Sequence, residues 1–95
     1  MQSKEAYLEK LQAKLKEWNA EIDKLKAKAA ESKADLKIEI EKRVGDLESR
    51  RQEVENKMQE LRQASESAME NIKSGAQRAW ENLDQAVKSA REKFK

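Results

Sequence analysis

Residues 8–25 read LEKLQAKLKEWNAEIDKL, and this stretch decides the fold. Its large apolar residues recur in alternating steps of three and four from Leu8 to Leu25. An α-helix with 3.6 residues per turn places such positions on one face, and the alternation is the a/d seam of a heptad repeat. The stretch therefore predicts a long amphipathic helix that pairs with another helix.

The same apolar seam extends beyond this stretch as far as Leu61. Between Leu36 and Leu47 the pattern spans eleven residues, a stutter that locally relaxes left-handed supercoiling. Ser32 and Arg51 are polar positions on it. We interpret Arg51 as a residue whose stem packs while its charged head reaches water, with a role in setting the register as the alternative. The predicted interaction seam comprises Leu8, Leu11, Leu15, Trp18, Ile22, Leu25, Leu36, Ile40, Val44, Leu47, Val54, Met58 and Leu61.

A different repeat organises the end of the chain. Residues 67–94 repeat with a period of eleven, so that Ala68, Ala79 and Ala90 are equivalent. Eleven residues in three turns is close to the natural helical repeat, so an apolar stripe stays on one face of a nearly straight helix. The alanines allow close approach, and Trp80 supplies buried area. The predicted tail packing face comprises Met69, Ile72, Ala76, Ala79, Trp80, Leu83, Val87 and Phe94.

The sequence contains two places at which a helix could end. The seam weakens in residues 28–35, and large apolar residues are missing from residues 62–67. Ser67 and Glu70 have the spacing of a capping box that would open the last helix. Breaks at both places predict a three-helix bundle, whereas a break at the second place alone predicts a long helix and a shorter one.

Helix propensity favours the second arrangement. The first place has no glycine or proline, and its Ala and Lys residues are good helix formers. We therefore expect a long helix that pairs antiparallel, either with the C-terminal helix or with another copy of the chain. In either arrangement the fold class is all-α: long amphipathic helices in an antiparallel coiled coil, a helical hairpin or a three-helix bundle, within a single domain of residues 1–95.

Composition restricts the classes of function. The chain has 95 residues, contains no Cys or His, is 42% charged, and has a net charge of +2. The soft ligands of structural metal sites and the usual nucleophile–base pairs are thus missing. Positive charges are interspersed with negative ones, unlike the clustered basic stripe of a nucleic-acid-binding helix. We expect no enzyme, no catalytic, cofactor or metal residues, no small-molecule substrate and no specific nucleic-acid partner.

These features predict a protein that acts by helix–helix pairing. Its partner would be itself, as a homo-oligomer, or another helical protein. The alternative is a peripheral protein whose tail helix lies on a membrane surface, since eleven-residue amphipathic repeats suit that placement. A third hypothesis is a coiled-coil protein that associates with nucleic acid. No segment reads as a signal peptide or approaches the ~18 apolar residues of a membrane span, so we expect a cytoplasmic protein.

The chain also carries local patterns that resemble a known family. The stretches concerned are YLEKLQAKLKEWNAEIDKLKAKA (residues 7–29), RQASESAMENIKSG (62–75) and RAWENLDQAV (78–87). Together they resemble a family of small bacterial coiled-coil proteins, described as stress-response or uncharacterised coiled-coil proteins. The most specific pieces are the pattern at Leu15–Leu25 and the Ala79–Trp80 pair. The resemblance implies a second Ala-Trp pair one repeat earlier, where this chain has Ala68 and Met69. It also implies a bacterial source and a stress-linked role, but no catalytic residue or cofactor.

Overall fold

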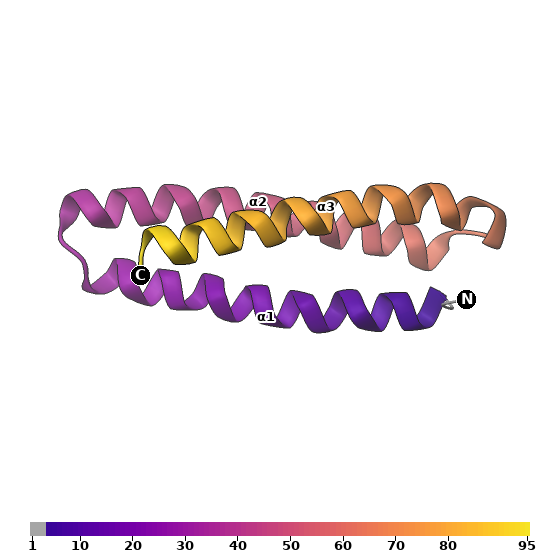
Figure 1. Cartoon of the computed structure of the whole chain (residues 1–95), viewed down its shortest axis with the longest axis horizontal. Helices are drawn as coiled ribbons and strands as arrows, with labels where there is room; N and C mark the ends of the chain where they lie inside the picture. Colours follow the sequence, from indigo (N-terminus) through magenta and orange to yellow (C-terminus); the bar gives the residue numbers. More distant parts are fainter. Residues whose placement is uncertain (1–3) are drawn as a thin grey trace.

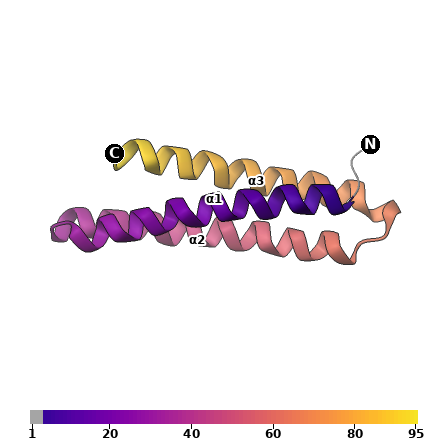
Figure 2. The same ribbon diagram turned by 90° about the horizontal axis from the view of Figure 1, so that it is seen from below.

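The computed structural model describes residues 4–95, which form three helices in up-down-up order joined by two short turns (Figure 1). The helices are α1 (Lys4–Glu31), α2 (Ala34–Gln63) and α3 (Glu66–Lys93). The described residues contain no strand. The bundle measures 51 × 18 × 17 Å, and a perpendicular view shows the three rods side by side over most of their length (Figure 2). The protein is therefore an elongated all-α bundle.

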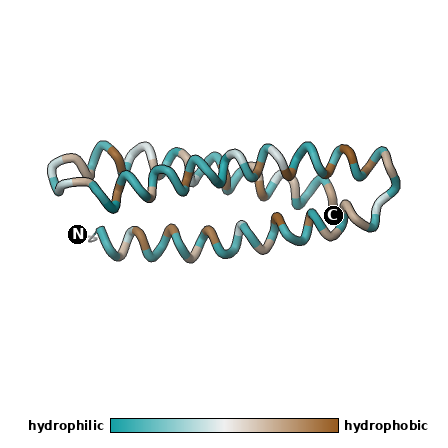
Figure 3. The backbone as a smooth tube through the Cα atoms, turned by 180° about the vertical axis from the view of Figure 1, so that it is seen from behind, coloured by the Kyte–Doolittle hydropathy of each residue, from teal (hydrophilic) through white to brown (hydrophobic). Residues whose placement is uncertain are grey.

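Local sequence explains why the chain is helical. It is rich in good helix formers and contains no proline. Within helices, Asp46 pairs with Arg50 and Asp84 with Lys88, each at 3.0 Å and each with the acid four residues before the base. Such pairs add a few tenths of a kcal/mol each, so most of the helical stability must come from packing. Figure 3 shows hydrophobic and hydrophilic residues recurring in turn along each helix, as packing on one face requires.

The expected long helix through residues 28–35 is wrong, because the chain turns at Ser32 and Lys33. The backbone N–H of Ser32 donates to the carbonyl of Ala29 at 3.1 Å, and its hydroxyl donates to the carbonyl of Lys28 at 2.7 Å. The physical reason for the turn is apolar burial. Burying one Leu or Ile side chain stabilises by about 1.5–3 kcal/mol, whereas helix propensities differ by only tenths of a kcal/mol. Folding back buries many such side chains within one chain.

The second turn lies inside the predicted break at residues 62–67 but is capped differently from the prediction. Ser65 is the N-cap of α3, and its hydroxyl accepts a hydrogen bond from the backbone N–H of Ala68 at 3.4 Å. The predicted capping box of Ser67 and Glu70 is therefore wrong. The extended backbone of Ser65 starts the helix two residues earlier, so Ser67 already lies inside α3.

All three helices contribute side chains to one continuous core. Its buried members are Tyr7, Leu11, Trp18, Ile22, Leu25, Ala29, Ile40, Val44, Leu47, Val54, Met58, Leu61, Ala76, Ala79, Leu83, Ala86, Val87, Ala90 and Phe94. Among the described residues, no charged or polar residue is fully buried. α1 and α3 contact each other less extensively than either contacts α2. Trp18 of α1 and Trp80 of α3 contact each other between these two helices.

Candidate interaction surface

The structure brings the predicted seam and the predicted tail packing face together inside one chain. The predicted residues that it buries are Leu11, Trp18, Ile22, Leu25, Ile40, Val44, Leu47, Val54, Met58, Leu61, Ala76, Ala79, Leu83, Val87 and Phe94. The predicted residues that it buries partly, against the core, are Leu8, Leu15, Met69, Ile72 and Trp80. The chain's own helices thus cover most of the surface that the sequence offered for pairing.

Leu36 is the exception among the predicted seam residues, because the chain's own helices leave it exposed. Leu36 is 39% exposed, and Ile38 beside it is 55% exposed. In Figures 1 and 2 the α1–α2 turn projects beyond the C-terminal end of α3. Leu36 lies in the first turn of α2 on this projecting end, so α3 does not cover it. Ile38 faces another side of α2, because two residues rotate a helix by about 200°.

Four core residues are missing from the two predicted lists. Ala29 continues the seam spacing and Ala90 the eleven-residue repeat, whereas Tyr7 and Ala86 lie on neither predicted face. Tyr7 is 5% exposed and Ala86 is 9% exposed. A helix in a three-helix bundle has two neighbours and therefore buries a wider stripe than a two-stranded coil does. The signal was present in the sequence: Tyr7 lies four residues before Leu11, and Ala86 lies three after Leu83 and four before Ala90. If each helix packs against two neighbouring helices, these spacings place Tyr7 and Ala86 within the wider buried stripe.

Three aromatic rings fill the space between α1 and α3. The ring of Trp80 lies 6.4 Å from that of Tyr7 and 6.1 Å from that of Trp18, the second pair edge to face at 77°. The ammonium of Lys73 sits 5.1 Å from the centre of the Tyr7 ring. Edge-to-face pairs contribute about 0.5–1.5 kcal/mol beyond their area burial. The tryptophans therefore act as packing anchors between these two helices.

The hydroxyl of Tyr7 is buried and has no hydrogen-bond partner among residues 4–95. Burial raises the pKa of Tyr7 above its ordinary value, and the negative charge of Glu81 raises it further. Leaving a buried hydroxyl unsatisfied costs about 1–3 kcal/mol. This group is thus a local source of instability in an otherwise apolar core.

Asp84 links α3 to α1 through a polar contact. Its Oδ1 accepts a hydrogen bond from the indole Nε1 of Trp18 at 3.3 Å, and its Oδ2 lies 3.0 Å from the Nζ of Lys88. Burial by itself raises the pKa of Asp84. Hydrogen bonds from Lys88 and Trp18 and the positive charges of Lys88 and Lys14 together outweigh burial, so the pKa lies below its ordinary value. Asp84 is therefore ionised at neutral pH and orients the Trp18 ring.

Arg51 connects α2 to α1 at a seam position. Its Nη1 donates to the Oδ1 of Asn19 at 2.9 Å, and its Nε lies 3.7 Å from the Oε1 of Glu55. The side chain is 28% exposed, so its head lies at the edge of the core. The bond to Asn19 links α2 to α1, and a role of Arg51 in setting the register of the two helices remains a prediction.

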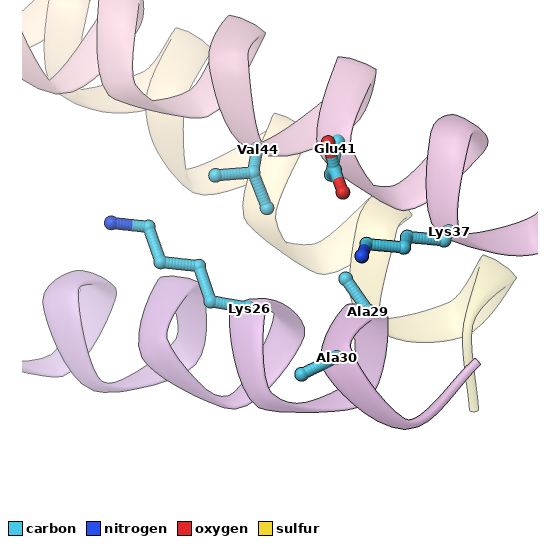
Figure 4. A pocket seen from close by; sticks show the side chains of 6 residues that line it. All are labelled: Lys26, Ala29, Ala30, Lys37, Glu41 and Val44. Carbon is cyan, nitrogen blue, oxygen red and sulfur yellow. The ribbon is translucent and has the colours of Figure 1, made fainter. Parts of the chain in front are cut away.

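A shallow groove of about 320 Å³ lies between α1 and α2 near their shared turn (Figure 4). Its lining residues are Lys26, Ala29, Ala30, Lys37, Glu41 and Val44. Small side chains form its floor and charges of both signs form its rim. The Nζ of Lys26 also lies 3.1 Å from the Oε1 of Glu48, which ties the two helices together beside the groove.

Within residues 4–95, no three acidic, Cys or His side chains are grouped so as to hold a metal ion. None of the helices in that range combines the length and the apolar character needed to cross a bilayer. No protein-family model, no curated protein and no solved structure matches the chain. The resemblance noted for residues 7–29 remains a prediction.

Proposed function

We propose that this protein is a non-enzymatic structural and interaction protein that works through helix–helix pairing, with a second copy of itself as the partner. One observation carries the proposal. The seam spacing continues from Leu25 to Ile40 straight through the α1–α2 turn, and Leu36 within this run is exposed. Covering Leu36 with a second copy would remove apolar area from water, at about 25 cal/mol per Å².

The charged surface supports pairing between copies. Ion pairs with partly exposed side chains join residues of both signs, for example Lys14 with Glu17 and Arg50 with Asp46. Each exposed pair adds little stability by itself. Interspersed charges nevertheless let two antiparallel surfaces meet with opposite signs in register, which favours one partner orientation over others. We further propose that the pairing serves a bacterial stress response, which the resemblance at residues 7–29 supports.

Sedimentation equilibrium over a wide concentration range tests the proposal. We expect the mass to rise from that of the 11.0 kDa monomer towards that of a dimer, with helicity unchanged. Leu36→Ser should weaken the association, whereas Ile38→Ser, an exposed residue on another side of α2, is the matched control and should not. A monomer at every concentration, or equal effects of the two variants, would overturn the proposal.

A lipid surface is the second candidate, and α3 is the observation in its favour. α3 is the most amphipathic of the three helices and ends in the basic residues Arg91 and Lys93. Its apolar face is covered by the other helices, with Leu83 fully buried, so lipid binding would require α3 to leave the bundle. A blue shift of tryptophan emission on adding anionic vesicles would support this candidate, and an unchanged spectrum would count against it.

A further inference from the structure

Most residues of the α1–α2 turn favour helix. It has the sequence Ala30-Glu31-Ser32-Lys33-Ala34, without glycine or proline. No described residue has a positive φ, so this turn contains no left-handed position that would lock it. The bond from the Ser32 hydroxyl to the Lys28 carbonyl spans four residues, and a continuous helix also allows such a bond.

The α1–α2 turn is also less firmly held than the α2–α3 turn. Lys33 is the N-cap of α2 and makes no side-chain capping bond. Ser65, in the other turn, caps α3 with its hydroxyl. The ammonium of Lys4 also donates to the carbonyls of Arg62 at 3.0 Å and Ala64 at 3.3 Å, which closes the end of α2. The turn at Ser32 and Lys33 is thus the natural hinge of the bundle.

We propose that two copies of this chain pair by exchanging α1 across this hinge, an inference that rests on the self-pairing proposed above. In the dimer, α1 and α2 of each copy form one helix over residues 4–63, about 90 Å long at ~1.5 Å per residue. The α1 helix of each copy packs on α2 and α3 of the other. Every contact that α1 makes in the monomer is made again between copies in the dimer. The monomer and the exchanged dimer therefore differ only in the conformation of the hinge, and the dimer is favoured as the protein concentration rises.

The exchange explains why Leu36, a seam residue at the projecting end of α2, is exposed in the monomer. The two hinges cross at the centre of the antiparallel dimer, where Leu36 of each copy meets the hinge of the other. The seam through Ala29 and Ser32 then continues without interruption.

Crosslinking distinguishes exchange from any other dimer. The ammonium of Lys26 lies 3.1 Å from the carboxylate of Glu48 across α1 and α2, and both side chains are partly exposed. The chain has no cysteine, so the variant Lys26→Cys/Glu48→Cys carries only this reactive pair. A short bismaleimide should join the pair within one chain in the monomer and between chains in an exchanged dimer. Denaturing electrophoresis of the isolated dimer fraction separates these two products.

Hinge variants give an independent test. Lys33 has φ −70°, which suits proline, so Lys33→Pro should keep the monomer folded. Proline inside a continuous helix is strongly unfavourable, and we expect dimer affinity to fall by about 100-fold or more. Ser32→Ala/Lys33→Ala should raise dimer affinity by about tenfold, because alanine favours the continuous helix. Small-angle scattering should show a dimer about 90 Å long, against 51 Å for the bundle.

Crosslinks between chains, with loss of the dimer in Lys33→Pro, support the exchange. A dimer whose crosslinks stay within chains, or a Lys33→Pro chain that is folded by circular dichroism and dimerises like the wild type, overturns the exchange and leaves the proposed pairing intact. Absence of any dimer overturns both.

Discussion

Replacing Tyr7 with Phe should stabilise the bundle, although Tyr7 belongs to its core. The Tyr7 hydroxyl is buried and has no hydrogen-bond partner among residues 4–95, and such a group costs about 1–3 kcal/mol. Phe keeps the ring that lies 6.4 Å from Trp80 and 5.1 Å from the ammonium of Lys73. We expect the free energy of unfolding to rise by about 1 kcal/mol, at the low end of the range because Tyr7 lies in the first turn of α1, where a helix opens most easily.

Urea unfolding followed by circular dichroism measures this change, and thermal unfolding gives a second estimate of it. In a domain of this size, 1 kcal/mol corresponds to about 4–8 °C in Tm. The matched control is Tyr7→Leu, which also removes the hydroxyl but loses the ring that packs at a tilt against Trp80. Its stability should fall below that of Tyr7→Phe by about 0.5–1.5 kcal/mol, the contribution of an aromatic pair.

Alkaline pH tests the same burial in another way. The folded state binds the phenolic proton of Tyr7 more tightly than the unfolded state, because its pKa is raised. The contribution of this tighter proton binding to the stability of the fold is fully present below about pH 10, the ordinary pKa of tyrosine. It is lost as the pH rises towards the pKa of Tyr7 in the folded state. Tyr7→Phe should lack this loss. Tyr7 is the single tyrosine of the chain, so phenolate absorbance follows it directly.

Two results would refute this reasoning. A Phe variant that unfolds at lower urea than the wild type would mean that the Tyr7 hydroxyl has a hydrogen-bond partner in solution. A phenolate that titrates in the folded protein at the ordinary pKa of tyrosine would mean that the hydroxyl is exposed to water.

Three further substitutions test the core, a helix interior and the polar link. Leu83→Ala removes a fully buried side chain and should lower the free energy of unfolding by about 2–5 kcal/mol; a loss below about 1 kcal/mol in urea would contradict the packing described. Gly45→Ala should stabilise by about 0.5–1 kcal/mol, because an added Cβ meets no atom within 4 Å and Ala favours helix; no rise in Tm would count against it. Asp84 has a lowered pKa, so its contribution is present above about pH 4 and is lost as pH falls through the folded pKa. Asp84→Asn should melt below the wild type at neutral pH and approach it near pH 2, and parallel melting curves across that window would argue against the role of this carboxylate.

Several parts of the structure could be read from the sequence because they depend on contacts between near neighbours in the chain. The spacing of Leu11, Trp18 and Ile22 identified the buried face of α1, since a helix places residues three and four apart on one side. The same spacing did not predict that Tyr7 is buried, because its burial requires a second neighbouring helix. The lack of a partner for its hydroxyl also depends on side chains from distant parts of the chain.

The sequence by itself determined that the chain is helical, where its apolar stripes run and that a helix ends near residues 62–67, because propensity, periodicity and capping are local. Only the tertiary structure decided that the chain also turns at Ser32 and Lys33, against the helix propensity of Lys33 and its alanine neighbours. A continuous helix gains tenths of a kcal/mol at these residues, whereas the hairpin buries seam residues such as Ile22 and Leu47 at about 1.5–3 kcal/mol each. That larger gain comes from residues far apart along the chain, so local sequence patterns do not reveal it.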